Sequence, residues 1–239
     1  AMGEYRNINN AKDIISSLIF QLRNPITAPS ETDRDEVKYV IDQKGSVDAS
    51  SAINFYTSFS NPSSPLNSWN RSFSSASDAF SAGDLALYLG RASELEVIRK
   101  NNPNLYFDVT QIPESSDPVS GKRGKATIYV MSLVKNTKNL AGGFSALNYL
   151  TNSDSQKYWS DIVQLPPARR DLLGIAPSNP FQTTFFKAAI QSQTWLDPEP
   201  EQSGLAFQDM IESISTGKQK AGEVITPFVN RLSNIYNSN

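Results

Sequence analysis

The stretch that most limits the possible folds is residues 85–89, an uninterrupted apolar run (LALYL) between Gly83 and Gly90. A run this short, bounded by glycines, is typical of a strand that is buried on both faces. A helical pattern at residues 94–100 and a second strand pattern at residues 105–112 follow it. Strand, helix and strand at this spacing predict a βαβ crossover, and therefore an α/β fold with a mostly parallel sheet.

Helical periodicity dominates the rest of the chain, together with a third strong strand pattern at residues 126–134. Ser93 with Glu96, and Ser153 with Gln156, have the spacing of capping boxes at helix starts. The sequence thus predicts many helices around a small mixed sheet. The expected helices cover residues 8–22, 48–59, 74–82, 94–100, 141–150, 153–163, 180–193, 204–216 and 221–236, with a short strand or turn at 37–41.

The composition excludes several kinds of chemistry. The 239 residues contain no cysteine and no histidine, which removes disulfides, thiol nucleophiles, the usual zinc ligands and every triad that needs imidazole. The net charge of −2 gives no support for binding nucleic acid. No apolar stretch is long enough for a membrane helix and no signal peptide opens the sequence, so a targeting segment of an exported protein would lie outside these residues.

Two patterns that point to catalysis or phosphate binding are explained more simply. The loop at residues 121–125 (GKRGK) lacks the first glycine of a phosphate-binding loop, because Val119 stands there, and Ala126 replaces the required Ser or Thr. A glycosidase needs two facing carboxylates, and the candidates are Glu94 with Glu96, residues 33–36 and residues 197–201. All of them lie in charge-rich, surface-like contexts, so we expect no enzyme activity and no cofactor or metal.

Aromatic residues near the ends of predicted elements are more informative. Trp69, Tyr88, Tyr129 and Trp195 all occupy such places. Aromatic rings there either belong to the core or stack on sugar rings that polar neighbours orient. The residues alone leave both interpretations open.

Several stretches, in this order, resemble a known family. Residues 1–15 are similar to the start of a helix that opens a second lobe, and residues 79–87 (AFSAGDLAL) to a stretch that enters a central strand. Residues 128–139, 144–156 and 167–171 resemble a strand returning through a hinge, a helix pair and the segment after it. Together they resemble the extracellular solute-binding proteins of ABC importers, the group that includes maltose-binding protein.

The resemblance implies a type II periplasmic-binding-protein-like fold, with two α/β lobes and a solute between them. Residues 1–113 would form the first part of the second, C-terminal lobe, residues 114–174 the hinge crossing and the remaining part of the first lobe, and residues 175–239 the C-terminal helices of the second lobe. Most of the first lobe is then missing, as in a truncated fragment. The resemblance also implies an extracytoplasmic lipoprotein whose only membrane attachment is an anchor upstream of this chain.

The resemblance places the ligand-binding residues on a tight turn and its surroundings. They are Tyr88, Arg91 and Ser93 at the turn, Trp69 and Arg71 before it, and Tyr129 on a later strand. Many family members carry a Trp just after the glycine of this turn, whereas this chain has Arg91, Ala92 and Ser93. The guanidinium of Arg91 would pair with a carboxylate or phosphate of a solute, donate to sugar hydroxyls, or instead form a structural salt bridge at a helix start.

The implied function is binding a carbohydrate or related polar solute and presenting it to the permease subunits of an ABC importer. The alternative is a solute-binding-like surface module that serves adhesion or sensing and no longer transports. Because the missing lobe would leave an edge and a cleft face open, a homodimer of the fragment is a further hypothesis.

Overall fold

The structure is a computed structural model, and it describes residues 1–30, 37–42, 48–114 and 123–237. Its contacts divide the chain into two compact units. Unit 1 comprises Ala1–Tyr106, Ile112–Lys125 and Gln193–Asn239, and unit 2 comprises Phe107–Gln111 and Ala126–Ser192. Residues 175–192 therefore fall in unit 2, and the assignment of either unit to a lobe of a binding protein stays a prediction.

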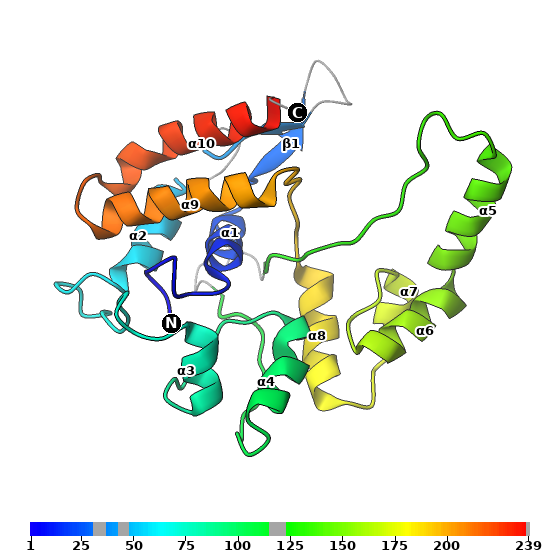
Figure 1. The fold of residues 1–239 in the computed structure, drawn as a ribbon, viewed down its shortest axis with the longest axis horizontal. Helices are drawn as coiled ribbons and strands as arrows, with labels where there is room; N and C mark the ends of the chain where they lie inside the picture. Colours follow the sequence, from blue (N-terminus) through cyan, green and yellow to red (C-terminus); the bar gives the residue numbers. More distant parts are fainter. Residues whose placement is uncertain (31–36, 43–47, 115–122, 238–239) are drawn as a thin grey trace. The chain divides into compact units, whose positions relative to one another are not determined.

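Unit 1 is built mainly from helices (Figure 1). The longest are α1 (Ala11–Gln21), α2 (Ser50–Ser58), α9 (Pro200–Ser215) and α10 (Ala221–Asn237). The short helices are α3 (Ala76–Ala82), the 3-10 turn η1 (Ala92–Glu94) and α4 (Leu95–Asn101). The strands β1 (Thr27–Pro29) and β2 (Val37–Tyr39) pair antiparallel, with Ala28 opposite Lys38.

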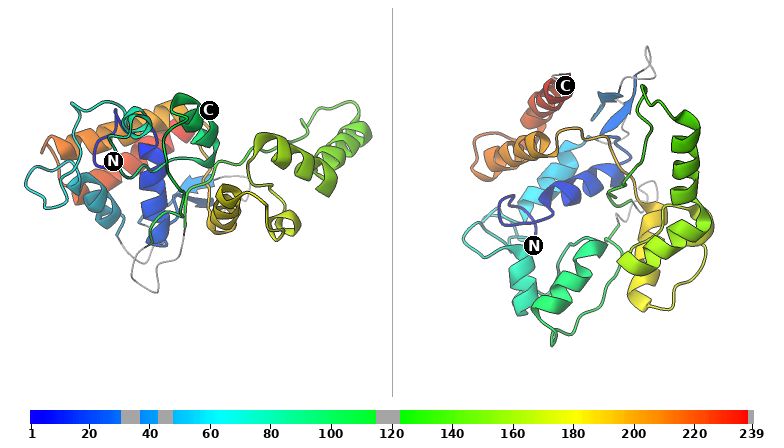
Figure 2. Two further views of the ribbon diagram at one scale, coloured as in Figure 1. Left: turned by 90° about the horizontal axis from the view of Figure 1, so that it is seen from below. Right: turned by 45° about the vertical axis from the view of Figure 1, so that its right-hand side comes forward.

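The core of unit 1 lies where α1, α2, α9 and α10 meet. Ile15 of α1, Ile53 of α2, Phe207 of α9 and Leu232 of α10 are all fully buried. Helices α9 and α10 lie side by side (Figure 1 and Figure 2), and the Phe207 ring meets Phe228 edge-on at 4.7 Å. Each helix contributes one apolar stripe, which is why their periodicity is readable in the sequence.

Unit 2 contains α5 (Leu140–Thr151), α6 (Ser153–Val163), α7 (Arg170–Leu173) and α8 (Pro180–Gln191), together with extended segments at residues 107–111 and 126–134. Three of its helices begin at asparagines whose side chains accept a backbone N–H bond. These are Asn139, Asn152 and Asn179. Such caps satisfy the first amides of each helix.

The predicted helices are largely confirmed. Helix α6 has the expected bounds, the start and end of α5 each differ by one residue, and a short strand forms within residues 37–41. Helix α7 and strand β1 were not anticipated. The expected capping boxes at Ser93 and Ser153 were wrong, because Glu94 caps the backbone of Arg91 and Asn152 caps the second helix. None of the described helices is long and apolar enough to cross a bilayer.

The three predicted strands, by contrast, are not strands. Residues 85–89, 105–112 and 126–134 are extended without strand pairing, and the parallel βαβ crossover is therefore wrong. Within the described residues, the sheet is the antiparallel β1–β2 pair. A separate, isolated parallel bridge links Lys125 and Gln193 outside this sheet. The buried character expected of residues 85–89 is also wrong, since Leu87 is 80% exposed. A run with strand composition becomes a strand only when another strand pairs with it, and among the described residues no strand pairs with these three runs.

Candidate functional site

The turn that carries Tyr88, Arg91 and Ser93 packs against polar side chains at the start of α1. The amide of Asn10 donates to the Tyr88 hydroxyl at 3.0 Å and to Glu94 Oε2 at 2.9 Å. Tyr88 in turn donates to Glu94 Oε1 at 3.2 Å, and its ring stacks on Phe80. Glu94 Oε2 also accepts the backbone N–H of Arg91 at 2.7 Å. The carboxylate of Glu94 therefore fixes the shape of the turn.

Burial and the nearby charge of Glu94 both raise the pKa of Tyr88 above its ordinary value of 10.0. The phenol is therefore a neutral hydrogen-bond donor at physiological pH. This state suits the observed contact, because an ionised Tyr88 would face the Glu94 carboxylate with like charge.

Asp13, one turn further along α1, is the centre of a second group of charges. Its Oδ2 accepts Arg91 Nε at 2.6 Å and its Oδ1 lies 3.2 Å from Lys125 Nζ. The side chains of Asp13 and Lys125 are 13% and 14% exposed, whereas that of Arg91 is 53% exposed. The backbone N–H of Lys125 donates to Ser17 Oγ at 2.8 Å.

We call Asn10, Asp13, Tyr88, Arg91, Glu94 and Lys125 the α1 edge cluster. Among the described residues, Asp13 holds Arg91 through its Nε atom, and the Arg91 side chain is 53% exposed. A guanidinium positioned at one nitrogen and open at the others is suited to donate to carboxylate, phosphate or sugar oxygens.

The other predicted binding residues lie in different surroundings. Ser93 is exposed within η1, close in the chain to Arg91. Trp69 is only 6% exposed and packs edge-on against Phe73, and Arg71 pairs with Glu4 and donates to Ser215. Tyr129 is 93% exposed and belongs to unit 2. The structure thus brings Tyr88, Arg91 and Ser93 together on one turn, and places Trp69 and Arg71 on another loop of unit 1.

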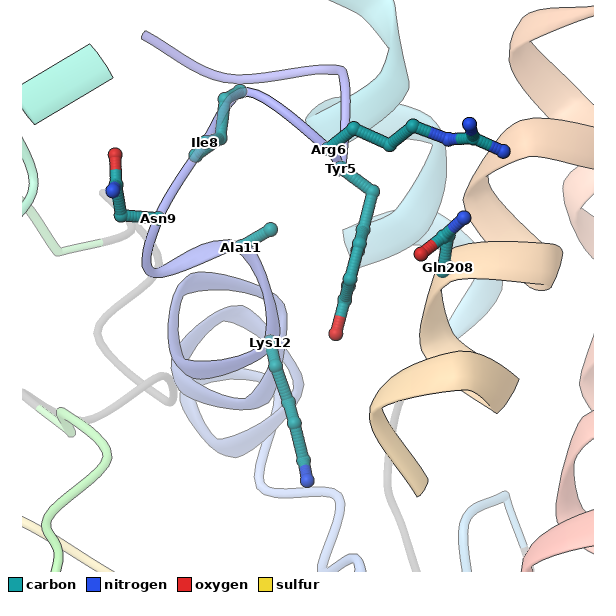
Figure 3. Close-up of a pocket in the computed structure, with 7 residues that line it drawn as sticks. All are labelled: Tyr5, Arg6, Ile8, Asn9, Ala11, Lys12 and Gln208. Carbon is teal, nitrogen blue, oxygen red and sulfur yellow. The ribbon is translucent and has the colours of Figure 1, made fainter. Parts of the chain in front are cut away.

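Sequence reasoning missed a hollow between the start of α1 and α9 (Figure 3). It has a volume of about 310 Å³, at the lower end of ligand pockets, and is lined by Tyr5, Arg6, Ile8, Asn9, Ala11, Lys12 and Gln208. The ring of Tyr5 lies between the two helices, and burial raises the pKa of its hydroxyl to about 12.

Lys12, at the edge of this hollow, is already neutralised and held in place. Its Nζ pairs with Asp197, donates to Ser203 Oγ at 2.6 Å and lies 5.1 Å from the centre of the Trp195 ring. A cation with this many partners is a structural element of unit 1. No signal in the sequence relates Lys12 to Asp197.

The carboxylates considered for catalysis have other partners. Glu94 holds the turn, Glu96 pairs with Arg99 on the surface of α4, and Asp197 binds Lys12. Residues 33–36 and the start of the basic loop at 121–125 lie outside the described residues. Among the residues that the structure does describe, no group of three or more metal-binding side chains occurs.

Comparison with known proteins gives similarity in structure only. No family model matches the sequence, and no curated protein matches it either. A cyclo/maltodextrin-binding protein complexed with maltotetraose matches with a TM-score of 0.70 and 14% identity, over 95% of this chain and 58% of that one. The maltose-maltodextrin binding protein of Alicyclobacillus acidocaldarius matches with a TM-score of 0.61 and 17% identity, over 92% and 58% of the two chains.

An ABC transporter solute-binding protein from Thermotoga lettingae, bound with alpha-D-tagatose, matches with a TM-score of 0.56 and 15% identity, over 97% of this chain and 58% of that one. The chain thus spans less than two thirds of the length of these structures. At such low identity the likeness concerns the fold. The expected fold class is confirmed: the chain adopts, in part, the periplasmic-binding-protein-like fold of ABC solute-binding proteins.

Proposed function

We propose that this protein is the substrate-binding component of an ABC importer and holds a carbohydrate or a related polar solute. The observation that carries the proposal is the shared fold over 95% of this chain with a protein complexed with maltotetraose. In this proposal the protein is extracytoplasmic, binds its solute without chemical change and delivers it to the membrane permease. A lipid anchor outside these residues would hold it at the membrane.

Arg91 is the residue we propose to contact the solute most directly. Asp13 fixes its Nε, so the outer nitrogens are positioned before any solute arrives, and a preorganised donor loses little freedom on binding. Tyr88 and Ser93 flank it on the same turn. Tyr129, considered by itself in unit 2, has an exposed ring that can stack on a sugar. Trp69 and Arg71, on the other loop of unit 1, remain further proposed contacts: Trp69 is 6% exposed, whereas the Arg71 side chain is 54% exposed and is held by Glu4 as Arg91 is held by Asp13.

Isothermal titration calorimetry with maltotetraose, tagatose and an acidic sugar tests the proposal on the protein as its own gene encodes it. We expect binding of at least one of them, weakened roughly 10-fold or more by Arg91→Ala, as for a lost charge-assisted hydrogen bond. Arg231→Ala is the matched control, because Arg231 forms an exposed ion pair with Asp209 on the distant helices α10 and α9. Binding that is absent for every sugar, or equally weakened in both variants, contradicts the proposal and favours the adhesion or sensing alternative.

A further inference from the structure

The loop between α2 and α3, residues 59–75, is almost without charge although most of it is exposed. Arg71 is the only charged residue between residues 49 and 77, in a chain that is 19% charged. Burial does not explain this, because the loop projects from unit 1 and its serines, asparagines and prolines are mostly open to water (Figure 1 and Figure 2). An exposed surface that avoids charge is typical of one that loses its water against a partner, since stripping water from a charge is costly.

Four apolar side chains lie on this loop and on the end of α2, and we call them the apolar patch: Phe55, Phe59, Leu66 and Phe73. Phe55, Leu66 and Phe73 are 46%, 44% and 48% exposed. The Phe55 and Phe59 rings meet edge-on at 5.3 Å, and Phe73 meets Trp69 in the same way at 5.1 Å. The Phe59 carbonyl accepts the backbone N–H of Trp69 at 3.1 Å, so the loop folds back and brings its apolar residues to the end of α2.

Two lysines lie on the turn beside this loop. The guanidinium of Arg71 donates to Ser215 Oγ at 3.2 Å, which ties the base of the loop to the end of α9. The residues that follow α9, 216–220 (TGKQK), are all exposed, and they include Lys218 and Lys220 but no acidic residue. An apolar patch with cations next to it is complementary to a bilayer surface, where hydrocarbon begins just below anionic headgroups.

We propose that the apolar patch lies against the headgroup region of a lipid bilayer that contains anionic lipids. Phenylalanine and leucine side chains enter the boundary between headgroups and acyl chains, and the two lysines meet the phosphates. A stable interface with another protein takes about 20–30 residues on each side, which four apolar side chains do not supply. A bilayer requires no matching shape, so a patch of this size is enough for a weak contact.

Sedimentation with lipid vesicles tests the proposal. Vesicles of phosphatidylcholine and phosphatidylglycerol at about three to one should bind the protein, and Leu66→Ser should weaken the binding roughly 10-fold, as for one leucine returned to water. The matched control is Leu205→Ser on α9, where the native side chain is 50% exposed in unit 1, and it should bind as the unsubstituted protein does. Absence of binding, or equal weakening by the two substitutions, overturns the proposal.

The charge of the vesicles gives a second readout. Lys218→Gln and Lys220→Gln should each weaken binding to the mixed vesicles about 5-fold and leave the weaker binding to pure phosphatidylcholine unchanged. The control is Lys100→Gln at the exposed end of α4, which should have little effect. Added salt should act like the two lysine substitutions, because it screens their charges. Binding that is equally strong with and without phosphatidylglycerol overturns the anionic bilayer as the occupant.

Tryptophan fluorescence locates the contact on the protein. Bromine atoms on lipid acyl chains quench only the indole rings close to them, and Trp69 packs against Phe73 of the apolar patch. Vesicles with brominated chains should therefore quench part of the emission, and Trp69→Phe should remove that part, whereas Trp159→Phe in unit 2 should not. Quenching that survives Trp69→Phe and disappears with Trp159→Phe would place the contact on unit 2 and overturn the proposal.

Two other occupants would give different results. Self-association without lipid that Leu66→Ser abolishes would identify a second copy, and sedimentation with cell membranes but not with protein-free vesicles would identify a membrane protein. Either result overturns the proposal. The lipid contact does not rest on the bound solute: vesicle binding without sugar binding would refute only the proposed function, and sugar binding without vesicle binding would refute only the lipid contact.

Discussion

Asp13→Asn provides the sharpest test of how the α1 edge cluster is held together. The side chains of Asp13 and Lys125 are 13% and 14% exposed and lie 3.2 Å apart, so the substitution removes one negative charge beside the Lys125 ammonium in a partly desolvated place. Removing one partner of a fully buried pair costs about 3–5 kcal/mol, and for this incomplete burial we expect about 2 kcal/mol. The Arg91 contact adds only about 0.5 kcal/mol, because the guanidinium is more than half exposed.

Urea unfolding followed by tryptophan fluorescence measures this loss. The control is Asp209→Asn, which breaks an ion pair of unit 1 with Arg231 in which the two side chains are 60% and 43% exposed, and it should cost under about 0.5 kcal/mol. Lys125→Met in the Asp13→Asn background should restore part of the stability, because it also removes the ammonium that has lost this ion pair. If Asp13→Asn costs no more than Asp209→Asn, the reasoning from burial is refuted.

Three further predictions concern other parts of unit 1. Burial, followed by the charges of Asp197 and Tyr236, raises the pKa of Tyr39 from 10.0 to about 12, so its stabilisation is complete below pH 10 and is lost as the pH rises towards 12. Tyr39→Phe should flatten the fall in melting temperature over that range, and an unchanged alkaline limb would exclude this residue as its source. Phe207→Ala should cost about 3–5 kcal/mol in urea unfolding, because the ring is fully buried against Phe228. Gly3→Ala should destabilise more than Gly83→Ala: both glycines have positive φ, but a Cβ at Gly3 would lie 2.4 Å from the backbone nitrogen of Ser60, whereas at Gly83 its nearest neighbour is 3.9 Å away. Equal melting temperatures for these two variants would show that the loop at Gly3 yields without cost.

The helices could be predicted from the sequence because their signals are local. Helix α6 begins after Asn152 and ends at Val163, and its cap and apolar stripe all lie within those residues. Strands follow a different logic, since an apolar run becomes a strand only when another strand pairs with it. Residues 85–89 and 126–134 have the composition of strands, but the described chain offers them no partner. That is why the sheet was the part of the fold that sequence reasoning got wrong.

For the candidate site, the turn at Arg91 was found from the sequence, but what organises it was not. The roles of Asn10 and Asp13 depend on contacts across 78 to 84 residues of chain. The spacing of Ser93 and Glu96 suggested a capping box, whereas Glu94 forms the cap and also receives Asn10 and Tyr88. One carboxylate serving several long-range donors leaves no local pattern to read.

The distribution of the tryptophans gives the two units different optical properties. Trp69 and Trp195 are each 6% exposed in unit 1, whereas Trp159 of unit 2 is 47% exposed. A shielded indole emits at shorter wavelength and shifts to the red when water reaches it, while a ring that is already wet shifts little. The red shift on unfolding will therefore follow the opening of unit 1. Quenching by added iodide, which needs access to the ring, will act first on Trp159, so two fluorescence readings from the same sample follow the two units separately.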